Sequence, residues 1–513
     1  MNRALKSVSV LVCFAALSAL TGCQGTSQPK SGEERASRAL DTARGNSLSL
    51  RAFLAEMPKG AELHYHLEGG IYAESWIRAG IEDRLCVNLA SMAFVKEASA
   101  TCKSGEVPAV KANQDQHLYD ELVDAFSMRG FVPTPGVTGH DHFFASFDKF
   151  DAADPPHTGE WLDEIATRAA AQNEQYLELL VTPNFSRTAM IAHQLGWQPN
   201  RSLGDFRDEL LAHGLRDDIA VARAYLDKGE SVHKQMEHCG ESSAAPACSV
   251  EIRYIYQVLR AFPPEQVFAQ TLLGFEAASA DPRFLGINYV QPEDDRTAMA
   301  DYALHMKMIA FLHGLYPAVH ISLHAGEIAP GLVTPDGLCC HIREAVEVAH
   351  AERIGHGVDV MYEDRPYDLL KEMAAKHVMV EINLTSNDVI LGVTGYDHPL
   401  PMYRRYGVPV ALSTDDEGVS RIDLTHEYVR AVETYALSYA DLKKMVRTSV
   451  EHSFLPGASL WREQDNFEQM VAQCAADAVG ETSSACADFL KSSEKAQQEW
   501  ELERRFAAFE ASQ

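Results

Sequence analysis

Residues 57–69 read MPKGAELHYHLEG, and this stretch holds the first expected strand together with a His-x-His pair at its end. Side chains alternate across a strand, so His64 and His66 project to the same side. Two imidazoles on one side suit two ligands of a single metal ion. Because the chain has 21 histidines, such a pair is weak evidence alone, and its meaning depends on the rest of the sequence.

Apolar runs rich in Val, Ile, Leu and Tyr recur along the chain, separated by stretches long enough for helices. This spacing predicts strand–helix units around a parallel sheet. Eight such units predict an α/β fold, the closed (β/α)8 barrel of the TIM type. The expected strands are residues 62–67, 176–182, 250–258, 285–290, 318–323, 353–356, 378–384 and 408–413.

Three segments lie outside this pattern. In residues 143–150 the phenylalanines fall at helical spacing, so we expect a helix rather than a ninth strand. A long insertion of roughly residues 86–142 follows strand one, and insertions at that face often act as lids or partner surfaces. Residues 460–513 are rich in Ala, Glu, Gln and Lys and indicate extra C-terminal helices outside the barrel. We interpret residues 47–513 as a single barrel domain.

The N-terminus has the features of an export signal. Arg3 and Lys6 precede an apolar run over residues 8–20, which is too short to span a bilayer comfortably. The ending Leu20-Thr21-Gly22-Cys23 resembles a bacterial lipobox, which implies that residues 1–23 are a lipoprotein signal peptide and that Cys23 is lipidated. Gln24 then favours the periplasmic face of the outer membrane, with residues 24–46 as a flexible tether. An ordinary secretory signal or an uncleaved apolar helix is the alternative.

Cysteine usage fits an exported protein. Once Cys13 has left with the signal and Cys23 carries the lipid, eight of ten cysteines remain in an oxidising compartment. The adjacent Cys339 and Cys340 do not bond to each other easily, so we expect buried thiols there. The pairs that we expect to close short loops are Cys86–Cys102, Cys239–Cys248 and Cys474–Cys486.

The net charge of the chain disfavours one class of binding partner, nucleic acids. The formal charge of -28 repels nucleic-acid phosphates, and no dense Lys/Arg run offers a local exception. We therefore do not expect polymeric DNA or RNA as a partner.

Three further polar clusters follow expected strands. Strand five ends in His324-Ala325-Gly326-Glu327, strand six in Gly355-His356-Gly357, and strand eight in Ser413-Thr414-Asp415-Asp416. Each alone has an ordinary explanation, such as a core histidine or a helix N-cap. Together with the His-x-His pair they all fall at the carboxyl ends of barrel strands, where such barrels build active sites.

Three neutral imidazoles and one carboxylate, with a water in the remaining position, form a catalytic arrangement suited to zinc. The expected ligands of one Zn²⁺ per chain are His64, His66, His324 and Asp415. Zinc lowers the pKa of its bound water to about 7.

The remaining members of these clusters suit proton transfer. His356 is placed to take or hold the proton of the water, and Glu327 can donate a proton to a ring nitrogen. Asp416, beside a ligand, can accept a hydrogen bond from the attacking water or the leaving amine.

Over roughly residues 57–457 the chain resembles the adenosine deaminase family, including secreted members. Segments 57–69, 323–327, 353–357 and 412–416 match its motifs in order, and 143–150 is similar to a helix that lines the family's hydrophobic pocket. The resemblance implies attack of zinc-activated hydroxide on C6 of adenosine or 2'-deoxyadenosine, giving inosine or its deoxy form and ammonia. It also implies that Glu327 protonates N1, that His356 activates the water, and that Asp416 orients it and contacts the base.

Two departures from the family concern the substrate. Glu68 stands where an aspartate commonly faces the ribose, and Gln291 stands where a glycine backbone often meets the purine. They leave open the alternative that the protein is an amidohydrolase acting on another 6-aminopurine, such as adenine, or on an N6-substituted nucleoside.

Two other classes of protein share part of this pattern. A catalytically silent nucleoside-binding lipoprotein would keep the pocket and lose turnover, but it has no need of a proton donor such as Glu327. The zinc deaminases with an H-x-E motif followed by P-C-x-x-C are matched only in their first half, by residues 66–68. No P-C-x-x-C occurs in the sequence, so that class is excluded.

Overall fold

The computed structural model describes residues 31–96, 101–153 and 157–513. The expected signal peptide and the lipidated Cys23 lie outside these ranges. Within them, no helix combines the length and the apolar character that crossing a membrane requires.

Eight parallel strands form the centre of the molecule, in the order β1-β5-β6-β7-β8-β9-β10-β11. A parallel bridge between Tyr65 and Asp415 joins the first strand to the segment after the last. All eight predicted strands are confirmed, with boundaries that differ by at most two residues. Their bounds are β1 Gly60–His66, β5 Glu174–Val181, β6 Glu251–Leu259, β7 Phe284–Val290, β8 His320–Ala325, β9 Arg353–His356, β10 Met379–Ile382 and β11 Val410–Leu412.

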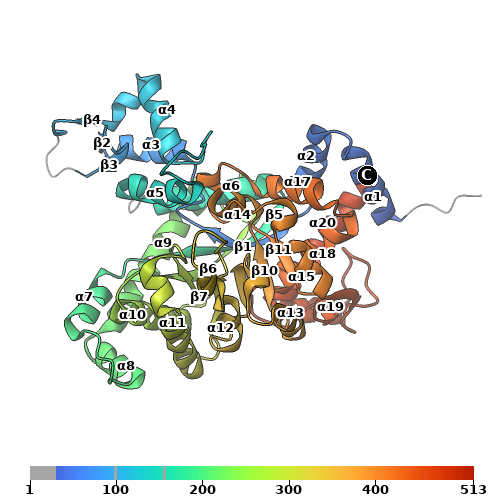
Figure 1. Ribbon diagram of the computed structural model, residues 1–513. Helices are drawn as coiled ribbons and strands as arrows, with labels where there is room; N and C mark the ends of the chain where they lie inside the picture. Colours follow the sequence, from blue (N-terminus) through green and yellow to red (C-terminus); the bar gives the residue numbers. More distant parts are fainter. Residues whose placement is uncertain (1–30, 97–100, 154–156) are drawn as a thin grey trace, which may run out of the picture.

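Helices surround these strands, so the predicted (β/α)8 barrel is confirmed (Figure 1). Every residue of β1 and β5 is buried, as expected for a parallel sheet covered on both sides. The helices from the first strand to the end of the barrel are α3 Ala73–Glu82, α4 Gln116–Ala125, α5 Gly139–Phe150, α6 Thr158–Ala171, α7 Ser186–Leu195, α8 Leu203–Ala212, α9 Asp218–Met236, α10 Pro264–Ala280, α11 Arg296–Leu315, α12 His341–Glu347, α13 Pro366–Ala375, α14 Leu384–Leu391, α15 Leu400–Tyr406, α16 Glu417–Ser420, α17 Leu424–Tyr435 and α18 Tyr439–Glu451.

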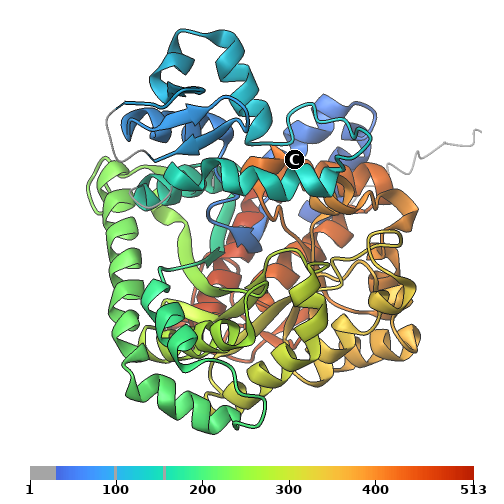
Figure 2. The same cartoon turned by 60° about the vertical axis from the view of Figure 1, so that its left-hand side comes forward.

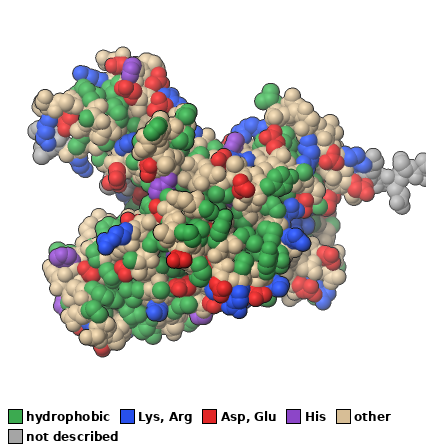
Figure 3. Space-filling view, viewed as in Figure 1, with side chains coloured by type: hydrophobic (Ala, Val, Ile, Leu, Met, Phe, Trp, Pro, Cys, Tyr) green, Lys and Arg blue, Asp and Glu red, His purple; other side chains and the backbone are tan. Residues whose placement is uncertain are grey.

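The insertion after strand one forms a small lobe of its own. Strands β2 (Cys86–Asn88), β3 (Ala93–Val95) and β4 (Glu106–Pro108) make an antiparallel sheet, which α4 follows. The lobe stands out from the body, with an indentation between it and the helices below (Figure 3). The helix predicted over 143–150 is confirmed as α5, which lies between the lobe and the barrel (Figure 2).

Aromatic packing ties the lobe to α5. The rings of Phe94 and Phe126 lie 5.0 Å apart, and Phe126 contacts Phe150 at 5.9 Å. Phe150 in turn stacks on Trp76 of α3 at 4.5 Å. The insertion therefore supports α5 from outside, and α5 supplies a wall of the cavity described below.

The tether predicted over residues 24–46 is wrong from residue 31 onward. Helix α1 (Gly32–Ala43) begins at a capping box between Ser31 and Glu34, and α2 (Ser47–Glu56) follows it. Ala36 and Leu40, one helical turn apart, are fully buried, and α1 packs against α18 and the last helix. This apolar stripe outweighs the polar composition that suggested a tether.

The C-terminal segment is helical only in its second half. Residues 461–470 form a hairpin of β12 (Trp461–Glu463) and β13 (Asn466–Met470), where the sequence predicted helices. The predicted helices follow as α19 (Ser484–Lys491) and α20 (Glu494–Ser512). The hairpin is stabilised by a separate small core, in which Trp461 and Phe467 pack with Trp500. Helical spacing in the sequence does not predict this packing.

The eight cysteines of the described ranges are all in disulfides. The three predicted pairs are present as Cys86–Cys102, Cys239–Cys248 and Cys474–Cys486. The expectation of buried thiols at Cys339 and Cys340 is wrong, because these two half-buried residues form a disulfide with each other. The peptide bond between them is cis.

Candidate functional site

The four predicted metal ligands meet at the carboxyl ends of their strands. His64 and His66 lie at the end of β1, His324 in β8 and Asp415 just after β11. Asp415 Oδ1 lies 3.1 Å from His66 Nε2 and 3.4 Å from His64 Nε2. The Nε2 atoms of His66 and His324 are 3.3 Å apart. All four side chains are buried, and their donor atoms lie within 4.8 Å of one another.

An outer set of oxygen atoms orients the three histidine rings. His64 Nδ1 lies 2.6 Å from Glu381 Oε2, His66 Nδ1 2.7 Å from Gln257 Oε1, and His324 Nδ1 2.6 Å from Asn288 Oδ1. A ring that donates through Nδ1 keeps its Nε2 lone pair free for a metal. The sequence reading missed Glu381, Gln257 and Asn288. The available signal was a polar residue within each of the apolar strands β10, β6 and β7.

The donor set fits a divalent metal ion. His64 Nε2 and Asp415 Oδ1 are buried and have no hydrogen-bond partner among the described residues. Buried polar atoms without partners are costly, and an ion between them would satisfy both. Three imidazole nitrogens and one carboxylate oxygen are ligand types that zinc accepts.

Three residues of this region adopt a left-handed backbone. The φ angles are 69° for His356, 64° for Asp415 and 85° for Gln291. Such conformations cost side-chain-bearing residues about 1–3 kcal/mol each and persist where the surroundings enforce them. Two contacts hold Asp415 in this conformation: the β-bridge to Tyr65, and a hydrogen bond of 2.6 Å that Ser386 Oγ donates to Asp415 Oδ2.

His356 and Glu327 lie side by side next to the metal ligands. His356 Nδ1 is 3.6 Å from Glu327 Oε1, and His356 Nε2 is 3.8 Å from Asp415 Oδ2. Burial lowers the pKa of His356 to about 3, so its ring is uncharged at neutral pH. Burial, with the nearby Asp415 charge, raises the pKa of Glu327 well above its ordinary value. This shift favours the protonated form of Glu327, which is the form that can donate a proton.

A fixed carboxylate holds the loop that carries Glu327. The backbone N–H groups of Gly326 and Glu327 donate to the two oxygens of Glu293, at 3.0 and 2.9 Å. Burial raises the pKa of Glu293, but His341, Arg260 and these backbone donors outweigh it and lower the pKa to about 2. Glu293 is thus an anion at neutral pH, and the sequence reading missed it.

Asp416 packs against the turn after the His-x-His pair. A Cβ atom on Gly69 would lie 1.5 Å from Asp416 Oδ1, so only glycine leaves room for this carboxyl. Burial and the adjacent Asp415 raise the pKa of Asp416 to about 8.

A cavity of about 710 Å³ opens above these groups. One wall is aromatic and comes largely from α5, while Glu68 and Gln291 line other sides. The side chain of Gln291 is tied back, because its Oε1 accepts a hydrogen bond of 2.8 Å from Ala261 N. The aromatic lining residues are Trp76, Phe143, Phe144, Phe147, Phe150 and Phe262.

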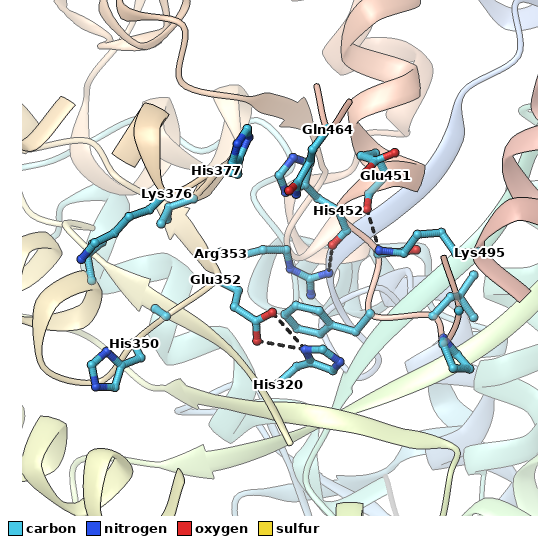
Figure 4. A pocket seen from close by; sticks show the side chains of 18 residues that line it. His320, His350, Glu352, Arg353, Lys376, His377, Glu451, His452, Gln464 and Lys495 are labelled. Atoms are coloured by element: carbon cyan, nitrogen blue, oxygen red, sulfur yellow. Dashed lines mark hydrogen bonds and ion pairs between the residues drawn. The ribbon is translucent and has the colours of Figure 1, made fainter. Parts of the chain in front are cut away.

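A second cavity, of about 570 Å³, is lined by the starts of β8 and β9, at the opposite end of the barrel (Figure 4). Several of its polar groups are engaged with neighbours: His320 Nδ1 lies 2.9 Å from Glu352, and Arg353 donates to His452 O at 3.1 Å. None of the residues predicted for catalysis or metal binding lines it. The predicted chemistry therefore belongs to the first cavity.

A (β/α)8 barrel with three histidines and an aspartate gathered at its strand ends defines the class of the metal-dependent amidohydrolases. The chain belongs to the adenosine deaminase family, because the family model described as "Adenosine deaminase" matches residues 160–462. This bears out the family resemblance found in the sequence.

Individual relatives match parts of the chain. An adenosine deaminase of Clostridium perfringens is 38% identical over 135 residues, which are 26% of this chain and only 37% of that relative. An adenine deaminase of Rhizobium rhizogenes is 30% identical over 259 residues, 50% of this chain and 74% of the relative. Among solved structures, an amidohydrolase from Burkholderia ambifaria with bound Zn has a TM-score of 0.52 and 18% identity, over 79% of this chain and 88% of that one. At that identity the likeness shows the fold alone.

Proposed function

We propose that the protein is a zinc-dependent hydrolytic deaminase of 6-aminopurine nucleosides, with adenosine and 2'-deoxyadenosine as favoured substrates. The products would be inosine or 2'-deoxyinosine, and ammonia. The observation that carries the proposal is that Glu327 and Asp416 line one aromatic-walled cavity together with three of the four expected metal ligands, while the fourth, His64, lies beside them.

His64, His66, His324 and Asp415 would hold the zinc ion, which when bound supplies Lewis-acid activation and lowers the pKa of a water to about 7. The neutral His356 accepts the proton of the attacking water, and Asp416 accepts a hydrogen bond that orients it. Glu327 donates its proton to purine N1, which makes C6 more electrophilic. The phenylalanines of α5 bury the purine and exclude bulk water.

A second candidate is deamination of another 6-aminopurine. The Rhizobium rhizogenes relative is described as an adenine deaminase, and Gln291 lines the cavity where the family often has a glycine. Both observations favour adenine or an N6-substituted nucleoside as the alternative substrate. A catalytically silent nucleoside-binding lipoprotein is disfavoured, because binding alone does not need the Glu327 and His356 pair.

We also propose that the protein is exported and anchored through Cys23. The four disulfides support this, since disulfides persist in oxidising compartments.

The test is to follow absorbance near the adenosine band after mixing protein and adenosine, with and without a strong chelator. Rapid, chelator-sensitive loss with inosine as product would support the proposal. If adenine is converted but adenosine is not, the second candidate replaces it. If neither is converted although zinc is bound, both assignments fail.

A further inference from the structure

A cluster of one histidine and three acids joins α3 to α6, outside the first cavity. Glu82 is the last residue of α3 and Asp83 follows it, while His157 caps the start of α6 and Glu160 lies one helical turn further on. One donor atom from each of Glu82, His157 and Glu160 lies within 4.8 Å of the other two. None of these four residues lines the first cavity or takes part in the proposed chemistry.

His157 is the buried member of this cluster. Its side chain is only 7% exposed, and each of its two ring nitrogens faces a different carboxylate. Nδ1 lies 3.1 Å from Glu160 Oε2, and Nε2 lies 3.4 Å from Asp83 Oδ1. Nε2 is buried and makes no hydrogen bond to a described residue.

This arrangement is unfavourable for an imidazole that holds no cation. A neutral ring carries a proton on one nitrogen only, so the lone pair of the other nitrogen faces a carboxylate oxygen. A buried polar atom without a partner is costly. A second proton or a metal ion at that nitrogen turns the repulsion into an attraction, and the nearby carboxylates favour an ion with two charges over a proton with one.

Neighbouring cations do not neutralise these carboxylates. In the part of the chain that the structure describes, no lysine or arginine forms an ion pair with Glu82, Asp83 or Glu160, Arg78 of the same helix included. Glu82 and Glu160 line a groove of about 1010 Å³ between α3, α6 and α9, which gives an ion access from solvent. The start of α6 disfavours a cation through its dipole, whereas the end of α3 and the three carboxylates favour one.

We propose that Glu82, His157 and Glu160, with Asp83 beside them, bind a second divalent metal ion. One imidazole nitrogen together with carboxylate oxygens is a ligand set that Zn²⁺ accepts. The His-x-x-Glu spacing places both side chains on one face of α6. This site shares no residue with the four ligands at the strand ends, so the protein holds two ions per chain rather than the one expected from the sequence.

The second ion ties α3 to α6 behind the aromatic wall of the first cavity. The ring of His157 lies 5.4 Å from that of Trp161 in α6, and Trp161 lies 4.6 Å from Trp76 in α3. Trp76 lines the first cavity. Binding of the ion therefore stabilises the contact between two helices that support this wall, and it raises the melting temperature of the protein.

The test counts the zinc ions bound per chain. The full chain is dialysed against buffered Zn²⁺ at several free concentrations, and the bound zinc is measured by metal analysis. We expect two ions in wild type and one in His157→Gln. The matched control His117→Gln removes an exposed histidine that lies 3.1 Å from Glu121 on α4, and it should keep two ions.

The possible counts separate this inference from the proposed function. A single ion in wild type that His157→Gln retains would overturn the inference, and so would two ions in wild type and in both variants. If wild type holds one ion and His157→Gln holds none, the second site stands and the catalytic zinc of the proposed function fails.

A conservative variant gives a second test that does not depend on His157. Glu160→Gln keeps the shape of the side chain but removes one carboxylate. We expect affinity for the second ion, measured by competition with a chromophoric chelator, to fall by about tenfold or more. Zinc should also raise the melting temperature of wild type more than that of Glu160→Gln. Equal affinities and equal shifts of melting temperature in the two proteins would contradict the site.

Discussion

The Nδ1 atom of His64 lies 2.6 Å from Oε2 of Glu381, and both side chains are completely buried. The other oxygen of Glu381 is 2.8 Å from Arg353 Nε, and Arg353 Nη1 is 2.6 Å from Glu178. A line of buried charges thus runs along the barrel interior from the metal-ligand cluster to Arg353, which lines the opposite cavity (Figure 4). Carboxylates that orient a ligating histidine raise its basicity and strengthen metal binding.

We expect Glu381→Gln to weaken zinc binding by about 10- to 100-fold, because the amide keeps the shape but loses the charge. Competition with a chromophoric chelator measures this independently of turnover. Glu372→Gln, which removes a carboxylate paired with Lys376 on the surface of α13, is the matched control and should leave zinc affinity unchanged. Equal affinities in wild type and Glu381→Gln would show that Glu381 does not support the site.

Glu327→Gln should lower kcat by about 10²- to 10⁴-fold, because the amide cannot donate the proton that N1 receives. Zinc content, measured by metal analysis, should stay at the wild-type value, since Glu327 is not among the four ligand residues. Undiminished kcat in a zinc-loaded Glu327→Gln protein would refute the assigned proton donor.

Gly69→Ala tests the close approach between Gly69 and Asp416. The added methyl group would overlap Asp416 Oδ1, so that carboxyl must move, at a cost of about 1–3 kcal/mol in stability or position. We expect kcat to fall at least tenfold, about the effect of 1.4 kcal/mol on the barrier. The control is Gly314→Ala in α11, where a Cβ meets no atom within 4 Å. The Gly314→Ala variant should keep its activity and its melting temperature. A similar loss of activity in the two variants would contradict the role assigned to the close approach of Gly69 and Asp416.

The sequence was enough to predict the barrel strands and to single out the polar side chains that gather at their carboxyl ends, because both leave local signals. Apolar runs mark strands one at a time, and clusters such as 324–327 are contiguous. Glu381, Gln257, Asn288 and Glu293 were missed for a different reason. Each is a single polar residue whose role depends on which strand or loop lies beside it. A single sequence does not show which elements are neighbours in the fold.

The other misses also have physical causes. Helix α1 was hidden by polar composition, although Ala36 and Leu40 carry a buried stripe. The β12–β13 hairpin packs in a small core that includes Trp500 of the last helix, and a periodicity argument does not reveal this contact between separate elements. The signal peptide, the lipid anchor at Cys23 and the periplasmic location stay predictions.

Glu293 predicts how stability depends on pH. Its pKa in the folded protein, about 2, lies below the ordinary value of 4.5, so the folded state binds the proton less readily than the unfolded chain. The stabilisation is therefore fully present above about pH 4.5 and is lost as pH falls toward 2. At 1.36 kcal/mol per pKa unit, it amounts to about 3 kcal/mol.

Replacing Glu293 with Gln removes this titration together with the contacts to Gly326 and Glu327. We expect the variant to be less stable than wild type at pH 7 but to lose less further stability between about pH 5 and pH 3. Thermal unfolding of the two proteins across this range measures the difference. The melting curves should converge as the pH is lowered, because protonation removes from wild type the interaction that the variant already lacks. If the melting temperatures of the two proteins fall by the same amount as the pH is lowered, other carboxylates control acid unfolding. The contacts of Glu293 with Gly326 and Glu327 are then not an important source of stability.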